Sequence, residues 1–152
     1  MLAYLASKEQ FLRDAPTIED IVAAQVKKTL YLSVGPGEYQ AWKISLGNAM
    51  SHVMLDARIP DDAAVAVEYR LNGRKFRIDF LIAGQDAQGL ESMVIIELKQ
   101  WEEIEFSDLE GHVKTFLGGN KRDVVHPSYQ AWSYATHMNM YNEYVYTNNL
   151  GV

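Results

Sequence analysis

Two acidic residues and a lysine lie next to apolar segments in the middle of this chain. Asp79 stands inside the mainly apolar run 76–82, and Glu97 and Lys99 directly follow the apolar run 94–96. A charge without a role is costly in such surroundings, so we interpret these side chains as functional. Two carboxylates suit a divalent cation, and a lysine beside them can orient water or offset phosphate charge. The pattern therefore predicts metal-assisted hydrolysis of a phosphodiester bond.

The expected cofactor is Mg²⁺ or Mn²⁺, with Asp79 and Glu97 as ligands and the backbone carbonyl of Leu98 as a third oxygen. This set leaves coordination positions for water and a substrate phosphate. A plainer interpretation stays open, because an Asp followed by Glu-x-Lys at loose spacing occurs by chance in many chains. Glutamate and lysine on a strand also form exposed ladders that have no catalytic role.

The segments that carry these residues alternate between apolar and polar side chains from position 64 onward, which indicates strands. The dipeptide 72–73, Asn-Gly, lies between two such runs and is a strong signal for a hairpin. We predict strands over about 64–71 and 74–83, then a polar loop, then a third strand over about 93–100. The acid and the lysine of the Glu-x-Lys pair, two positions apart, then project to the same side.

A two-residue hairpin turn would fix the register of the first two strands. It pairs Glu68 with Arg77 and Ala66 with Asp79, so that the three ionisable side chains share a face. Glu68 then has two interpretations, a cross-strand ion pair with Arg77 or a catalytic contact to metal or water. Glu38 is a second candidate for such an outer acid, or simply a favourable charge at a helix N-terminus. The other face is predicted to be apolar, lined by Val65, Val67, Tyr69, Phe76, Ile78 and Phe80.

Helical patterns fill the first part of the chain, about 1–60. Ser7 is followed three residues later by Gln10, and Thr17 by Asp20, and in each pair the later side chain can reach back as in a capping box. Helices are therefore expected to begin at Ser7 and Thr17. The second of these helices should cover about 17–31, and a third should cover about 38–55.

The last third of the chain is predicted to be less regular. Residues 101–126 are expected to form loop and short helix, and a helix should follow from Pro127 to about residue 140. Gln130 and Tyr134 lie one turn apart on one face of that helix. Residues 145–147 have the composition of a strand entering a turn, so we expect the chain to stop before the last strand of its domain.

Composition limits the alternatives. A chain of 152 residues, 48% hydrophobic, can bury one core, and we expect a single domain over 1–152. The absence of cysteine favours a reducing compartment, and we expect the cytoplasm. The sequence contains no run of about 18 apolar residues, so we expect no membrane-spanning helix. The net charge of -6 argues against nucleic-acid binding by a uniformly basic surface. The cluster of basic residues in 112–126 is either a local basic edge or an ordinary solvated loop.

Several blocks of the sequence, in order, resemble the PD-(D/E)xK nuclease superfamily. Asp79 and the Glu97-x-Lys99 pair match its acidic and lysine positions, and Gln130 with Tyr134 is similar to the helix motif of its RecB-like branch. The likeness covers most of the chain. It is most specific to the N-terminal region of bacterial nuclease-helicase fusion proteins, whose C-terminal part is a domain of unknown function with P-loop ATPase motifs. The blocks that carry it are 67–69, 77–80, 96–101 and 126–134.

The resemblance implies an α/β fold with a restriction-endonuclease-like core, in which helices flank a mixed central sheet behind a helical N-terminal segment. It implies Asp79 and Glu97 as metal ligands, Lys99 as the catalytic lysine, and Gln130 and Tyr134 as supports of the site. It also implies that DNA, including invading phage DNA, is the substrate. A helicase or ATPase domain is then an expected partner, since this chain has no P-loop motif of its own.

Our leading hypothesis is a metal-dependent deoxyribonuclease, with helices over about 1–60 and the catalytic sheet and following helix over about 64–147. The alternative is a non-catalytic nucleic-acid-binding or dimerisation module that retains the nuclease fold. Hydrolysis of RNA and the formation of a homodimer are also left open. The sequence does not distinguish endonuclease from exonuclease action.

Overall fold

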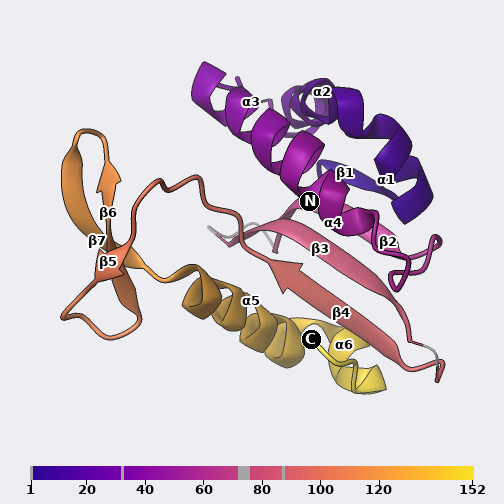
Figure 1. Cartoon of the computed structure of the whole chain (residues 1–152). Coiled ribbons are helices and arrows are strands. Elements are labelled where there is room, and N and C mark those ends of the chain that lie inside the picture. The colour runs from indigo at the N-terminus through magenta and orange to yellow at the C-terminus, as the bar shows by residue number, and fades with distance from the viewer. Residues whose placement is uncertain (1, 32, 72–75, 87) are drawn as a thin grey trace.

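A four-stranded antiparallel sheet forms the centre of the protein (Figure 1). The computed structural model describes residues 2–31, 33–71, 76–86 and 88–152. The sheet has the order β1-β2-β3-β4, in which each strand pairs antiparallel with the next. The hairpin turn predicted at 72–73 lies outside the described residues. The four strands are β1 (Tyr4–Ser7), β2 (Ala64–Arg70), β3 (Arg77–Gln85) and β4 (Glu91–Ile96).

Helices cover both faces of this sheet, which establishes the mixed α and β class (Figure 1). One side is formed by α1 (Lys8–Asp14), the 3-10 turn η1 (Ala15–Thr17), α2 (Ile18–Leu30), α3 (Pro36–Trp42), the π-helical segment η2 (Lys43–Met50) and α4 (Ser51–Met54). The other side is formed by α5 (Pro127–Tyr141) and α6 (Glu143–Asn148). Each side has its own apolar core against the sheet. Among the described helices, none has the length and apolar character needed to span a membrane.

The register of β2 and β3 differs from the prediction by two residues. Ala66 pairs with Leu81, and Arg70 pairs with Arg77, so the connection between the strands is longer than a two-residue turn. Arg77 and Asp79 nevertheless stay close together, with 3.8 Å between Arg77 Nε and Asp79 Oδ1. Glu68 forms no pair in the ladder and has a left-handed backbone, with φ of 55°.

The predicted single apolar face is also wrong, because five of its members divide between the two cores and the sixth, Phe76, is 40% exposed. Val65, Val67 and Phe80 pack under the helical layer of α1 to α4. Ile78 and Tyr69 pack instead in the core beneath α5. The left-handed residue between Val67 and Tyr69 reverses the alternation of side chains at that point of β2, which explains why these two residues of β2 lie in different cores.

Residues 101–126 form a second sheet and not the predicted loop and short helix. Its strands are β5 (Glu105–Phe106), β6 (His112–Leu117) and β7 (Asn120–Val125), and it projects away from the central sheet near the start of α5 (Figure 1). Gly118 and Gly119 connect β6 to β7 with φ of 60° and 81°. Two successive positive φ angles are typical of the tight turns that join antiparallel strands.

Three further predictions need correction. Residues 4–7 form a strand that pairs with β2, and residues 143–148 form a helix where a strand was expected. The central sheet is antiparallel in its described ladders and not mixed, with one isolated parallel bridge between Ser92 and Gly151. The helix at 127–140 is confirmed as α5, and the helix at 17–31 is confirmed as α2, which begins one residue later.

The two predicted helix caps differ, and this difference gives a test of stability. Ser7 Oγ accepts a hydrogen bond from the backbone N–H of Gln10 at 3.2 Å, whereas Thr17 makes no side-chain cap bond. We expect Ser7→Ala to lower the free energy of unfolding by about 1 kcal/mol, because it removes that bond. Thr17→Ala, the matched control, should change it by less than about 0.5 kcal/mol. Urea denaturation measures both, and equal losses would contradict the cap assignment.

Candidate active site

The two predicted metal-binding acids lie together where β4 ends. Asp79 comes from β3, and its Oδ2 accepts a hydrogen bond from the backbone N–H of Leu98 at 3.1 Å. Because the Leu98 N–H donates to a side chain, it is not available for a backbone hydrogen bond between β4 and β3. The strand β4 accordingly ends at Ile96 and not near residue 100 as predicted. Glu97 and Lys99 therefore project from irregular backbone that Asp79 holds against β3.

Glu97 is a buried carboxylate with one oxygen that has no hydrogen-bond donor. Its side chain is 3% exposed, and its Oε1 lies 2.5 Å from Lys99 Nζ. Its Oε2 is buried without a partner among the described residues. Burial raises the pKa of Glu97 to about 7, an effect that Asp79 strengthens and Lys99 opposes. A carboxyl in this position must hold a proton or face a cation.

A divalent cation fits this pair of carboxylates. When Glu97 is ionised, its Oε2 and the Asp79 carboxylate offer only acceptors to each other, and a cation would satisfy both. The described part of the chain contains no group of three or more Asp, Glu, His or Cys side chains arranged to hold a metal. The set is thus limited to two carboxylates, which is common for Mg²⁺ because the ion retains several waters. The role of the Leu98 carbonyl stays a prediction.

The predicted helix residues border the same cavity. Gln130 Nε2 donates a hydrogen bond to Tyr134 Oη at 2.7 Å. Burial raises the pKa of Tyr134, with Glu97 and Asp79 contributing, so the phenol stays protonated and can donate. The cavity has a volume of about 410 Å³ and is lined by Arg70, Arg77, Asp79, Glu97, Leu98, Lys99, Gln130 and Tyr134. The structure therefore brings together Asp79, Glu97, Lys99, Gln130 and Tyr134 as the sequence predicted.

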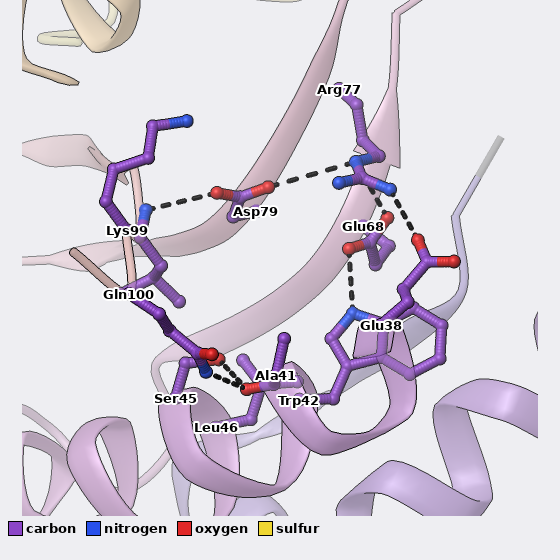
Figure 2. Close-up of a pocket in the computed structure, with 11 residues that line it drawn as sticks. Glu38, Ala41, Trp42, Ser45, Leu46, Glu68, Arg77, Asp79, Lys99 and Gln100 are labelled. Atoms are coloured by element: carbon purple, nitrogen blue, oxygen red, sulfur yellow. Dashed lines mark hydrogen bonds and ion pairs between the residues drawn. The ribbon is translucent and has the colours of Figure 1, made fainter. Parts of the chain in front are cut away.

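A second group of charges adjoins Asp79 on the side of α3 (Figure 2). Arg77 lies 3.0 Å from Glu68 and 2.9 Å from Glu38, and its Nε lies 3.8 Å from Asp79. The ion pair that the sequence suggested between Glu68 and Arg77 is thus present, although the predicted register is not. Whether Glu68 or Glu38 also contacts metal or water stays a prediction, since both carboxylates are held by Arg77.

Trp42, which was not among the predicted site residues, also supports this second group of charges. Its Nε1 donates a hydrogen bond to Glu68 Oε1 at 2.9 Å, and the indole is buried. A signal was present, because Glu38 and Trp42 are four residues apart on one helix and therefore share a face. The left-handed backbone of Glu68 had no such signal. Strain of this kind costs about 1–3 kcal/mol and is concentrated at functional sites.

The basic cluster of 112–126 belongs to the projecting sheet. Lys114 pairs with Asp108 at 3.4 Å, and Lys121 pairs with Glu105. His126 accepts a hydrogen bond from the backbone N–H of Ser128 and so caps the start of α5. These contacts favour the interpretation as an ordinary solvated region over that of a basic edge at the acidic site.

Comparisons with protein-family models, with curated proteins and with solved structures find no match to this chain. The fold and the site themselves show a protein of the mixed α and β class whose cavity contains two neighbouring carboxylates, Asp79 and Glu97. Its resemblance to the PD-(D/E)xK superfamily stays a prediction based on the residues described above.

Proposed function

We propose that this protein is a metal-dependent nuclease that hydrolyses DNA phosphodiester bonds. The observation that carries the proposal is the buried, donor-free Oε2 of Glu97 next to the Asp79 carboxylate, with the Lys99 ammonium 2.5 Å from the other Glu97 oxygen. Such a combination is costly to bury unless it serves a charged ligand. Two acids and a lysine suit a divalent cation together with a phosphate, because the acids can bind the cation and the lysine can offset the phosphate charge.

Each residue has a distinct role in this proposal. Asp79 and Glu97 would hold Mg²⁺ or Mn²⁺, which when bound lowers the pKa of water and offsets the charge that builds on the phosphate. Lys99 offsets phosphate charge or orients the attacking water. Gln130 and Tyr134 also line the cavity, and the hydrogen bond between them orients the two side chains. In a longer protein of the kind that the sequence resembles, a helicase or ATPase domain would deliver the DNA.

DNA cleavage by the purified protein tests this proposal. We expect end-labelled DNA to be cut in Mg²⁺ or Mn²⁺ and to stay intact in EDTA. Asp79→Asn should abolish cutting, because it removes one ligand charge. Asp62→Asn is the matched control, since Asp62 is an exposed acid outside the site. Equal cutting by the wild type and Asp79→Asn would indicate a contaminant. Metal-dependent binding of DNA without cutting would support the non-catalytic module instead.

The raised pKa of Glu97 predicts how metal affinity depends on pH. Below a pKa of about 7 the folded protein holds a proton on the group that must bind the cation, so metal and proton compete. We expect Mn²⁺ affinity to rise by up to about tenfold per pH unit below 7 and to level off above it. Calorimetry in buffers of different ionisation enthalpy should show proton release at pH 6 and almost none at pH 8.5. A flat profile between pH 5.5 and 8 would contradict Glu97 as a ligand.

A further inference from the structure

A row of aromatic side chains leads outward from the wall of the 410 Å³ cavity along α5. Tyr134, in the cavity wall, meets the edge of Phe76 with 5.9 Å between ring centroids. Phe76 lies 5.4 Å from His137, and His137 lies 4.6 Å from Tyr141 with 34° between the ring planes. We call these four residues, Tyr134, Phe76, His137 and Tyr141, the aromatic ladder.

The two ends of the aromatic ladder differ in exposure, and His137 between them is partly buried. Tyr134 is 5% exposed, Phe76 is 40% exposed and Tyr141 is 68% exposed. Helical spacing explains why His137 and Tyr141 touch, since they are four residues apart on α5. It does not explain Phe76, which precedes β3 and contacts two rings of α5, those of Tyr134 and His137. The ladder thus joins two elements beside the site and leaves ring surface open to solvent.

The charges next to the aromatic ladder suit a polyanion once a divalent cation is bound. Three cationic side chains, Arg70, Arg77 and Lys99, line the cavity together with the two acids Asp79 and Glu97. Arg77 is also paired with Glu38 and Glu68. These seven groups sum to a formal charge of -1, and a bound divalent cation brings the sum to +1. A phosphate of a nucleic-acid strand in the cavity would place neighbouring nucleotides against Phe76 and Tyr141.

A ring surface of this kind selects bases that are not already stacked. In a duplex the faces of the bases are covered by their neighbours, whereas an unpaired strand can place each base on an aromatic side chain. The projecting sheet also exposes the rings of Phe106 and Phe116, but it projects away from the central sheet that carries the site (Figure 1). Among the ring contacts between described residues, the aromatic ladder includes a ring of the cavity wall, Tyr134, whereas the pair of Tyr129 and Trp132 does not.

We propose that the aromatic ladder is a binding subsite for the unpaired bases of single-stranded DNA, which makes the single strand the substrate of this nuclease. The assignment rests on the proposed function for the position of the scissile phosphate. It adds that phosphate contacts in the cavity position the strand and that stacking on Phe76 and Tyr141 distinguishes a single strand from a duplex.

Binding without cleavage tests this subsite. Fluorescence anisotropy would compare a labelled oligothymidylate, the same backbone with abasic sites, and a duplex of equal length, with Ca²⁺ in place of Mg²⁺ or Mn²⁺ so that a cation is present and cleavage is limited. We expect the wild type to bind the oligothymidylate at least about tenfold more tightly than the abasic strand or the duplex. Tyr141→Ala and Phe76→Leu should each reduce that preference by about tenfold, whereas Tyr141→Phe, which keeps the ring, should retain it.

Trp132→Ala is the matched control. Trp132 is 60% exposed on the same helix, but it stands two positions before Tyr134 and contacts Tyr129 and not the ladder. It should leave binding unchanged. An equal loss in Trp132→Ala, equal affinity of the wild type for the abasic strand, or equal affinity for the duplex would overturn the subsite. Thermal melting would confirm that Tyr141→Ala and Phe76→Leu remain folded.

The failure of this inference differs from the failure of the proposed function. A protein that binds single strands through the ladder and never cuts DNA in any metal would overturn the nuclease and leave the subsite standing. A protein that cuts DNA in an Asp79-dependent manner, with Tyr141→Ala and Phe76→Leu unchanged in single-strand binding, would overturn the subsite alone.

Discussion

Replacing Glu97 by glutamine should reduce DNA cleavage by on the order of a thousandfold, or about 4 kcal/mol of transition-state stabilisation. The amide keeps the size of the side chain but removes a ligand charge. The same change should raise the free energy of unfolding at pH 8, because it removes a buried carboxylate oxygen that has no donor. Activity and stability are thus expected to move in opposite directions, which is typical of a site whose charge serves a ligand.

Glu102→Gln is the control for this prediction, because Glu102 is an exposed glutamate a few residues further along the chain. It should leave both cleavage and stability close to the wild type. Single-turnover cleavage assays and urea denaturation at pH 8 measure the two quantities. If Glu97→Gln retains more than about a tenth of wild-type cleavage, or is less stable than the wild type at pH 8, Glu97 has a structural role and not the one assigned here.

Replacing Arg77 by leucine should lower the free energy of unfolding by about 2–3 kcal/mol at pH 8. It leaves the Glu68 carboxylate, 5% exposed, with the Trp42 indole as its hydrogen-bond partner and no cation beside it. We place the value below that of a fully buried pair because the Arg77 side chain is itself 38% exposed. Urea denaturation at several pH values measures the loss.

The loss should shrink as the pH falls. Burial already raises the pKa of Glu68, and Arg77 lowers it, so removal of Arg77 raises that pKa further. A carboxyl whose folded-state pKa is raised destabilises the protein above that pKa and ceases to do so once it takes up a proton. Glu68→Gln in the Arg77→Leu background should restore much of the stability. Arg58→Leu breaks a surface pair with Asp56 and should have little effect. A loss that does not depend on pH would contradict a buried charge as its cause.

Local signals in the sequence predicted part of this fold correctly. Ser7 caps α1 as expected, and α5 begins at Pro127, because these features depend on residues close together in the chain. The β1 strand could not be found in this way, since Tyr4 pairs with Val67 far along the sequence. At the other end, 145–147 has the composition of a strand, but Asn142 Oδ1 accepts a hydrogen bond from the backbone N–H of Val145 and starts a helix.

The candidate site was predictable to the level of which residues meet. Asp79 and Glu97 converge because β3 and β4 are neighbours in the sheet, and strand signals carry that information. The backbone around them was not predictable, because β4 ends where the Asp79 side chain takes the Leu98 N–H, a contact between distant residues. The hairpin of β6 and β7 had a signal in the pair Gly118 and Gly119, but the sequence around it predicts only loop and short helix.

Anomalous diffraction from a crystal soaked in Mn²⁺ tests the central claim most directly, because it locates the ion. We predict a peak in contact with the carboxylates of both Asp79 and Glu97, inside the cavity that Lys99 and Tyr134 also line. The peak should vanish in Asp79→Asn. A wild-type crystal with no peak at these two carboxylates, or with a peak bound only elsewhere on the protein, would contradict the account.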